Sequence, residues 1–373
     1  MTKPTRPRRI LHVLYSARIA GAEEYVRMIT AALDPAKFES TVCFMHTHDT
    51  MVDKMRNAGV PVRVIGMKNG LDLVRSLRFL SFVLREKFDL IHIHMPNVLA
   101  VTFSLMACKT VILHEHTIGA HAKRRKLLLP LLFKKIKKFV AVSHNTKNNL
   151  LRLQSIPERK LTVIHNGIEI SRFQVSFDKE EFRRQHGISP NTFIIGFVAR
   201  LEDEKGCDLL LTALAKVKEK INRDFHLLLF GQGSKEKEWK ELTAELGLHE
   251  NVTFMGVLPD ITRYFNIFDL FVLPSRLEPF GLVILEAMAC SVPSIAFEVG
   301  GIPEFLRHEQ DGYLIPPFDT DIMADRIISL INSDILRKSL GTNARKRVED
   351  FSIRKTVRQL ESLYSELLEA EHN

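Results

Sequence analysis

The sequence predicts an α/β protein with two doubly wound domains, in each of which helices cover a parallel sheet. Short apolar segments of strand length alternate with amphipathic segments of helical period along the chain. A polar connector at residues 173–190 interrupts this alternation once, and the alternation then restarts. The length of 373 residues also exceeds what one hydrophobic core usually supports. We therefore expect two domains of similar size, with a ligand crevice at the carboxyl ends of the strands.

The predicted elements follow the hydrophobic period of the sequence. In the first half, strands are expected at residues 10–15, 40–46, 60–65, 89–94, 110–114, 139–142 and 161–164. Helices are expected between them at 22–33, 51–58, 71–87, 97–107 and 145–153. In the second half, strands are expected at 193–198, 226–230, 252–254, 270–273, 294–296 and 313–315. Helices are expected there at 207–220, 235–246, 261–265, 321–332, 335–348 and 352–369, and a further short apolar helix is expected to begin near Gly281.

Composition and cysteine usage limit the class of protein. Apolar residues make up 45% and charged residues 26% of the chain, as in an ordinary soluble globular protein. No apolar run approaches the ~18–20 residues that span a bilayer, and the basic N-terminus leads into a strand without a signal sequence. Cys43, Cys108, Cys207 and Cys290 are scattered without CxxC spacing, which predicts free thiols in a reducing cytoplasm.

Part of the net charge of +9 lies between residues 118 and 141, a segment without acidic residues. The apolar run LLLPLLF at 127–133 separates two basic clusters, which suits a segment at the headgroup level of an anionic membrane. The alternative is a buried helix whose ends are solvated by Lys and Arg. A nucleic-acid partner is not expected, because no recognition motif accompanies the charge. The basic residues are Lys123, Arg124, Arg125, Lys126, Lys134, Lys135, Lys137 and Lys138.

The segment 273–303 carries two carboxylates eight residues apart, Glu278 and Glu286. Glu278 is expected in a loop after a strand, and Glu286 about two turns into the helix that follows. The amides at the start of that helix, near Gly281 and Leu282, favour an anion between the two acids. A sugar hydroxyl at one acid, a phosphate at the amides and a ribose at the other acid fit this arrangement.

Further candidates lie at other predicted strand ends. Arg200 ends a strand and Lys205 precedes a helix, so the two cations can clamp a pyrophosphate, although an isolated pair of this kind more often makes surface salt bridges. Gly231 and Gly233 permit close packing under a nucleotide. Gly21 lies in a strand-to-helix loop, which either lets a ligand approach the backbone or serves packing alone.

His114 and His116 close another predicted strand, where a histidine can donate to a phosphate or a sugar hydroxyl. Because they share one side of an extended chain, metal binding has to be considered, but a third ligand is not evident. His92 and His94 form a similar pair on the neighbouring strand, with one expected in the core and the other near the crevice rim. The sequence therefore predicts no metal site.

The motifs AGAE, HEHT, VIHNGIE, GFVARLEDEKG, FGQG, EPFGLVILEAMA and EVGGIPE, taken together and in this order, resemble glycosyltransferase family 4. The resemblance covers nearly the whole chain, and its most specific element is the acid-x7-acid motif from Glu278 to Glu286. Enzymes of this family have the GT-B fold and transfer a sugar from a nucleotide diphosphate donor with retention of configuration. One departure is Ala20 before Gly21, where the family commonly has Gly-Gly.

The resemblance implies a role for each matching residue. Arg200 and Lys205 would bind the donor diphosphate and stabilise the leaving nucleotide. Glu278 and His116 would contact the donor sugar in catalysis, and Glu286 would hold the ribose hydroxyls. No metal and no other cofactor would be needed, because the leaving phosphate helps to deprotonate the acceptor. The remaining donor-binding positions are Gly21, Gly231, Leu258, Phe280, Gly281 and Leu282.

The resemblance also implies a domain division, because the last helix of GT-B proteins usually returns to the N-terminal domain. We expect an acceptor-side domain at 1–170 with helix 352–373 packed on it, and a donor-binding domain at 171–351. The expected enzyme moves a hexose-type sugar from a UDP- or GDP-sugar to a lipid-linked or membrane-associated acceptor. It would act in bacterial cell-envelope polysaccharide or lipopolysaccharide biosynthesis, at the inner face of the cytoplasmic membrane. The alternatives are a GT-B epimerase or phosphorylase, and a non-catalytic nucleotide-sugar-binding protein.

Overall fold

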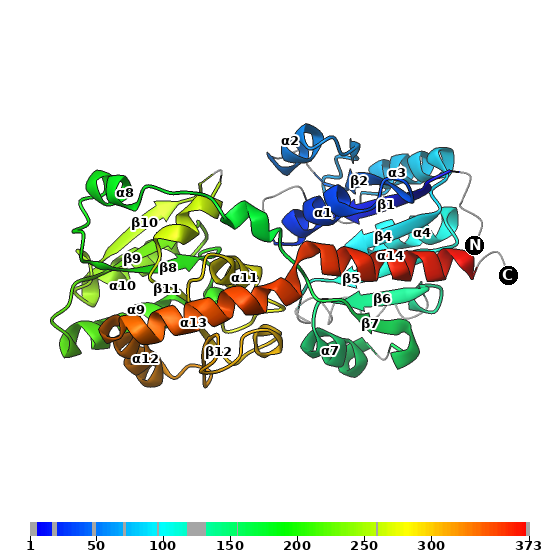
Figure 1. Ribbon diagram of the computed structural model, residues 1–373. Coiled ribbons are helices and arrows are strands. Elements are labelled where there is room, and N and C mark those ends of the chain that lie inside the picture. Colours follow the sequence, from blue (N-terminus) through cyan, green and yellow to red (C-terminus); the bar gives the residue numbers. More distant parts are fainter. Residues whose placement is uncertain are drawn as a thin grey trace. The chain divides into compact units, whose positions relative to one another are not determined.

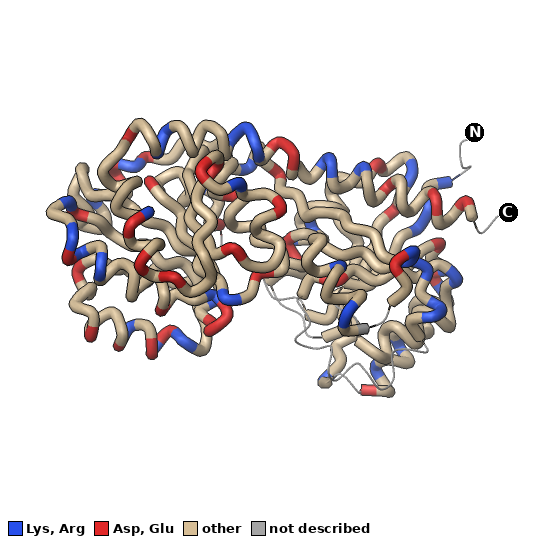
Figure 2. Tube along the Cα trace, turned by 90° about the horizontal axis from the view of Figure 1, so that it is seen from below, with Lys and Arg blue, Asp and Glu red and all other residues tan. Residues whose placement is uncertain are grey.

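The computed structural model describes residues 6–16, 21–46, 50–69, 72–94, 97–117, 132–154, 156–258 and 260–370. The chain divides into an N-terminal unit, made of residues 1–167 with 353–373, and a C-terminal unit, made of residues 168–352 (Figure 1). The boundaries expected from the sequence, after residues 170 and 351, lie close to these. Lys and Arg residues are interspersed with Asp and Glu over both units (Figure 2).

The N-terminal unit contains a parallel sheet of seven strands in the order β3-β2-β1-β4-β5-β6-β7. The order reverses between β1 and β4, so the carboxyl ends of these strands form the switch point at which open α/β sheets bind ligands. The strands are β1 (Arg8–Leu14), β2 (Phe38–Phe44), β3 (Val62–Val64), β4 (Leu90–His94), β5 (Val111–Glu115), β6 (Lys138–Ala141) and β7 (Leu161–Val163).

Helices cover both faces of this sheet. One face packs against α1 (Gly21–Ala32), α2 (Thr50–Asn57) and α14 (Ile353–Glu369). The other face packs against α3 (Leu73–Glu86), α4 (Val98–Ala107) and α7 (His144–Gln154). The apolar side chains of β1 alternate between the two cores, as expected for a strand that is buried on both faces.

The C-terminal helix α14 completes the N-terminal unit and lies beside α1 (Figure 1). Its buried residues Val357, Leu360 and Tyr364 recur at helical spacing and join the core on that face. The carboxylate of Glu361 accepts a hydrogen bond of 2.8 Å from the backbone N–H of Asp34, which follows α1. The helix therefore belongs to the first sheet, although the chain reaches it only after the C-terminal unit.

The face below α1 and α14 carries an unusual row of buried histidines. His12, His92 and His114 lie on the neighbouring strands β1, β4 and β5, and each is 0% exposed. His92 and His94 point to the same face, with ring centroids 4.1 Å apart, and both are fully buried. The expectation that one of these two lies near the rim is therefore wrong, because strand alternation places residues i and i+2 on one face. We name His12, His92, His94, His114 and His116 the histidine cluster.

The C-terminal unit contains a parallel sheet of six strands in the order β10-β9-β8-β11-β12-β13, which reverses between β8 and β11. Its strands are β8 (Phe193–Val198), β9 (Phe225–Phe230), β10 (Val252–Gly256), β11 (Leu270–Leu273), β12 (Ser294–Phe297) and β13 (Gly312–Ile315). Its helices are α8 (Lys179–Gln185), α9 (Cys207–Lys220), α10 (Glu236–Glu245), α11 (Leu282–Ala289), α12 (Thr320–Asn332) and α13 (Asp334–Arg347). The predicted fold class, two doubly wound α/β units, is confirmed.

The segment that the sequence analysis treats as a polar connector contains helix α8. Asp178 caps this helix, since its carboxylate accepts a hydrogen bond of 2.8 Å from the backbone N–H of Glu181. Phe182 is buried and anchors the helix to the unit. Phe182 is the one buried apolar side chain of this helix, so the sequence has too weak a hydrophobic period to predict it.

The histidine cluster predicts an acid-sensitive N-terminal unit. Burial disfavours the charged ring and lowers the pKa of His12 to about 3, and it lowers the pKa values of His92, His94 and His114 well below the usual range. The unfolded chain therefore binds more protons below pH ~6.5, and the unfolding free energy falls as the pH decreases through that value. Each buried histidine contributes about 2 kcal/mol to this loss between pH 7 and pH 5.

Calorimetry of the full chain at pH 7 and pH 5 measures this effect. His114→Phe should reduce the loss of stability on acidification, whereas the matched change His249→Gln, at an exposed position of the C-terminal unit, should leave it unchanged. Equal acid sensitivity in the wild type and in His114→Phe would rule out the histidine cluster as its source.

Candidate functional site

The switch point of the C-terminal unit brings together three residues that the sequence analysis singles out. The loop after β8 carries Arg200 and then Lys205, which ends a 3-10 turn at Asp203–Lys205 just before α9. The loop after β11 carries Glu278 and leads into α11. Because β8 and β11 are neighbouring parallel strands, both loops lie at the same edge of the sheet.

Lys205 and Glu278 form the central contact of this site. The Nζ atom of Lys205 lies 2.8 Å from Oε2 of Glu278, and the hydroxyl of Ser275 donates to the same oxygen at 3.1 Å. Glu278 is 7% exposed, so its charge is largely removed from water. A desolvated carboxylate needs such partners, because a buried charge without them is strongly destabilising. The structure thus holds one acid of the acid-x7-acid motif directly against a cation.

Arg200, unlike Lys205, forms its ion pair at the surface. Its guanidinium donates to the carboxylate of Glu204, four residues later, and both side chains are exposed. The surface salt bridge that is the alternative role for Arg200 is present. Exposed ion pairs of this kind contribute little to stability, so a polyvalent anion such as a diphosphate can displace Glu204 from Arg200. The ion pair and an anion-binding role are therefore compatible.

Two residues outside the predicted site, Arg276 and Asp208, join the two loops. Arg276 makes a bidentate ion pair with Asp208 at 2.8 and 2.5 Å, and its backbone N–H donates to the carbonyl oxygen of Glu204 at 2.8 Å. Bidentate arginine–carboxylate pairs fix geometry as well as contributing energy. The sequence signal was weak: Arg276 lies two residues before Glu278, but nothing in the spacing identifies Asp208 as its partner.

The start of α11 completes the site. Gly281 has a left-handed backbone with φ 102°, and Leu282 is the first residue of α11, whose leading amides point out of the helix start. The ring of Phe280 packs against that of Phe305 with centroids 5.1 Å apart, and the residue as a whole is 2% exposed, so its side chain belongs to the core beneath the site. Glu286 is half-buried one turn further along α11.

The remaining donor-side positions lie at the same edge of the sheet. Leu258 follows β10 and is half-buried. Gly231 follows β9, and its backbone N–H donates to the carbonyl oxygen of Gly256 at 2.8 Å. At Gly231 φ is +135°, and a Cβ atom would lie 1.8 Å from the carbonyl oxygen of Ala199. Only glycine fits there, which keeps the loop after β9 tight against the loop after β8.

In the N-terminal unit, the two predicted site residues lie at the carboxyl edge of the first sheet. His116 follows β5 and is half-buried, with its Nε2 atom 3.0 Å from Nδ1 of His94. Gly21 begins α1, and the loop residues before it, Ala20 included, lie outside the described residues. The carboxylate of Glu23, two residues after Gly21, accepts a hydrogen bond of 3.0 Å from the hydroxyl of Ser16.

The described lysines of the basic segment lie at the opposite edge of the first sheet. Lys123, Arg124, Arg125 and Lys126 fall outside the described residues. The exposed Lys134, Lys135 and Lys137 precede β6, and Lys138 is its first residue. Because the strands are parallel, these lysines lie at the amino edge, whereas His116 lies at the carboxyl edge. The described lysines therefore do not contribute to the same ligand site as His116.

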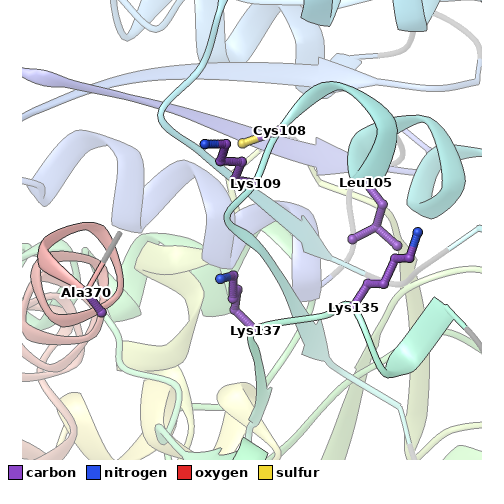
Figure 3. A pocket seen from close by; sticks show the side chains of 6 residues that line it. All are labelled: Leu105, Cys108, Lys109, Lys135, Lys137 and Ala370. Carbon is purple, nitrogen blue, oxygen red and sulfur yellow. The ribbon is translucent and has the colours of Figure 1, made fainter. Parts of the chain in front are cut away.

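A pocket of about 410 Å³ opens at this amino edge (Figure 3). It is lined by Leu105, Cys108, Lys109, Lys135, Lys137 and Ala370, from the ends of α4 and α14 and the residues before β5 and β6. Nearby, Leu132 and Phe133 pack against the core. The ring centroids of Phe133 and Phe139 are 5.2 Å apart. Leu132 and Phe133 are thus partly buried, and the rest of the apolar run lies outside the described residues. Among the described residues, no helix is long and apolar enough to cross a membrane.

The loop glycines provide a test of this local geometry. Gly206 and Gly247 have nearly the same φ, +67° and +66°, but a Cβ atom at Gly206 would lie 2.0 Å from the carbonyl oxygen of Pro274, whereas at Gly247 it would meet nothing within 4 Å. Gly206→Ala should therefore destabilise the C-terminal unit by roughly 1–3 kcal/mol more than Gly247→Ala, since both share the same backbone strain.

Denaturant unfolding followed by the fluorescence of Trp239, the single tryptophan of the chain and buried in this unit, measures the difference. Equal destabilisation by the two changes would show that the loops after β8 and β11 are not packed as described.

Comparisons with known proteins identify the family of the chain. The family model of glycosyl transferases group 1 matches residues 178–347, and that of glycosyltransferase family 4 matches residues 19–172. The N-acetyl-alpha-D-glucosaminyl L-malate synthase of Bacillus anthracis is 30% identical, over 81% of each chain. The lipopolysaccharide core mannosyltransferase LpsB of Rhizobium meliloti is 31% identical, over 56% of this chain and 61% of its own, so this match leaves more than a third of that relative unaligned.

Solved structures share the fold. The Anabaena protein HepE, in complex with UDP and glucose, superimposes with a TM-score of 0.84 at 24% identity, over 96% of this chain and 100% of its own. A glycosyltransferase of Rickettsia africae superimposes with a TM-score of 0.82 at 23% identity, over 97% of this chain and 99% of its own. Both units of this chain are therefore covered by one known architecture. The chain belongs to glycosyltransferase family 4 and has the GT-B fold of these enzymes.

Proposed function

We propose that this glycosyltransferase transfers a hexose-type sugar from a UDP- or GDP-sugar, with retention of configuration. The observation that carries the proposal is the desolvated Lys205–Glu278 pair at the switch point of the C-terminal unit, beside Arg200 and the start of α11. Such a switch point is where α/β sheets bind nucleotides. Cations and helix-start amides suit a diphosphate, and a buried carboxylate suits a sugar hydroxyl.

In the proposed mechanism, Arg200 and Lys205 bind the diphosphate and stabilise the negative charge that develops on the leaving nucleotide. Glu278 accepts hydrogen bonds from the sugar while it remains paired with Lys205, and Glu286 holds the ribose. The leaving phosphate takes the proton of the acceptor hydroxyl, so the reaction needs no metal ion. His116 donates to an oxygen of the donor sugar from the N-terminal unit.

We propose an acceptor in bacterial cell-envelope polysaccharide or lipopolysaccharide biosynthesis, at the inner face of the cytoplasmic membrane. Two relatives support this class by name: LpsB, and the capsular polysaccharide biosynthesis glycosyltransferase CapM of Staphylococcus aureus, which is 30% identical over 61% of each chain. The relative with 81% coverage is instead named for a malate conjugate, which makes a small acceptor the second candidate.

A donor screen tests the activity. We expect release of the nucleoside diphosphate from at least one UDP- or GDP-hexose in the presence of a membrane lipid extract or of L-malate. Arg200→Ala should lower the rate roughly 10²–10³-fold, because it removes a cation from the developing charge. Arg263→Ala, which removes an exposed cation elsewhere in the same unit, should leave the rate unchanged. No turnover of any donor, together with no nucleotide-dependent rise in melting temperature, would contradict the proposal.

Membrane attachment has its own test. Replacing Lys134, Lys135 and Lys137 with glutamine should weaken binding to phosphatidylglycerol vesicles roughly 100-fold, at about 1 kcal/mol for each lysine. A matched control replaces the exposed Lys218, Lys237 and Lys240 of the C-terminal unit and changes the net charge equally. Cosedimentation measures both. Equal weakening by the two sets would show that net charge, and not the amino edge of the first sheet, drives attachment.

A further inference from the structure

The histidine cluster contains an ordered chain of three imidazoles that ends at His116, at the carboxyl edge of the first sheet. His12 lies on β1, His94 ends β4, and His116 follows β5. The Nδ1 atom of His12 lies 3.3 Å from Nε2 of His94, and Nδ1 of His94 lies 3.0 Å from Nε2 of His116. His12 and His94 are 0% exposed, whereas His116 is half-buried. The chain therefore runs from the core to the carboxyl edge of the sheet.

The three rings are neutral at physiological pH. Burial lowers the pKa values of His12, His94 and His116, because the charged ring loses its hydration. The ring of Tyr25 packs edge-on against His116 and His94, with centroids 5.2 and 6.2 Å away, and so restricts both rings from the side of α1. A neutral imidazole has one N–H donor and one bare nitrogen acceptor. Both hydrogen bonds of the chain must therefore run in the same direction.

The inner end of the chain decides the direction. The Nε2 atom of His12 is buried and has no hydrogen-bond partner. If the bonds ran inward from His116, this nitrogen would carry a buried N–H without an acceptor. If they run outward, it is a bare acceptor, and every N–H of His12 and His94 is satisfied. Orphaned N–H groups are rarer in protein interiors than under-satisfied acceptors, so the outward direction is favoured.

We propose that His12 and His94 are positioning residues that hold His116 in the Nδ1–H tautomer. His12 Nδ1–H donates to His94 Nε2, and His94 Nδ1–H donates to His116 Nε2. The nitrogen of His116 that is not used by the chain, Nδ1, then carries the proton. His116 is thus a fixed hydrogen-bond donor across the physiological pH range, suited to an oxygen lone pair of a sugar hydroxyl or phosphate. The contact of His116 with a sugar or phosphate oxygen rests on the proposed function, whereas the assignment of the tautomer does not.

A metal ion explains the cluster less well. Two sets, His12 with His92 and His94, and His94 with His114 and His116, place their nitrogens within 4.8 Å of one another. Each set consists of neutral imidazoles alone, without a carboxylate or a thiolate. A divalent ion there would bring two uncompensated positive charges into the core of the unit. The hydrogen bonds of the chain account for the short distances from His94 to His12 and to His116.

Long-range 1H–15N NMR of the full chain with 15N-labelled histidine tests the tautomer directly. The resonances of His116 are assigned by their loss in His116→Gln. In the wild type, Nδ1 of His116 should be protonated and Nε2 should be the bare acceptor. His94→Phe removes the donor to Nε2 and should shift His116 away from this tautomer. His94→Asn, whose amide N–H₂ can replace the Nδ1–H donor, should restore it.

Three results would overturn the proposal. They are an Nε2–H tautomer of His116 in the wild type, an unchanged tautomer in His94→Phe, and stoichiometric Zn²⁺ binding that shifts the resonances of His94, His114 and His116. The last would establish a metal site in place of the hydrogen-bonded chain.

Kinetics test the link to the proposed function separately. With an accepted donor, His94→Phe should lower kcat roughly tenfold with little change in the KM for that donor, and His94→Asn should regain most of the rate. Equal kcat values for the wild type and His94→Phe would show that the three hydrogen-bonded histidines do not contribute to catalysis. If no donor is turned over, the NMR result still decides the tautomer, so the two claims fail independently.

Discussion

The candidate site of the C-terminal unit is organised around one contact, the ion pair between Lys205 and Glu278. These side chains belong to loops that follow neighbouring strands at the point where the strand order reverses. A carboxylate that is 7% exposed is retained only with partners, and Lys205 and Ser275 provide them. The pair therefore fixes the distance between the two loops before any ligand arrives. Gly206 and the Arg276–Asp208 ion pair reinforce this spacing.

The two charged contacts at this site differ in a way that suits their proposed roles. Lys205 is paired with the buried carboxylate of Glu278. The position of its ammonium group is therefore fixed, and the carboxylate partly neutralises its positive charge. Arg200 is paired with the exposed Glu204, so its guanidinium can exchange one anion for another at small cost. A diphosphate would meet one preorganised cation and one adaptable cation. The N-terminal unit is organised around neutral groups instead, since burial keeps the histidine cluster uncharged.

The sequence predicted most of the architecture because its signals are local. Strands such as Phe193–Val198 and Leu270–Leu273 are continuous apolar runs, and their bounds are recovered from composition alone. Helix α8 was missed, because one buried phenylalanine and one capping aspartate give too weak a period. The resemblance to family 4, and not the hydrophobic pattern, supplied the return of α14 to the first unit.

The candidate site could be predicted only in part, because sequence signals are local. Arg200, Lys205 and Glu278 stand at strand ends, where position alone suggests chemistry. The pairing of Arg276 with Asp208, 68 residues away in sequence, has no local signature. The chain from His12 through His94 to His116 requires the register of three strands, which spacing along the sequence does not contain. His12 and His94, 82 residues apart in the sequence, become neighbours only through the sheet order.

The most direct measurement of the central claim compares Glu278→Ala with Glu286→Ala in nucleotide affinity and in turnover. Removing Glu278 leaves Lys205 with its full charge, so nucleoside diphosphate affinity by titration calorimetry should be retained while kcat falls. Removing Glu286 should weaken nucleotide binding and leave kcat at saturation nearly unchanged, because this acid is proposed to hold the ribose. Equal losses of affinity in both variants, with no difference in kcat, would contradict the division of the two acids between sugar and ribose.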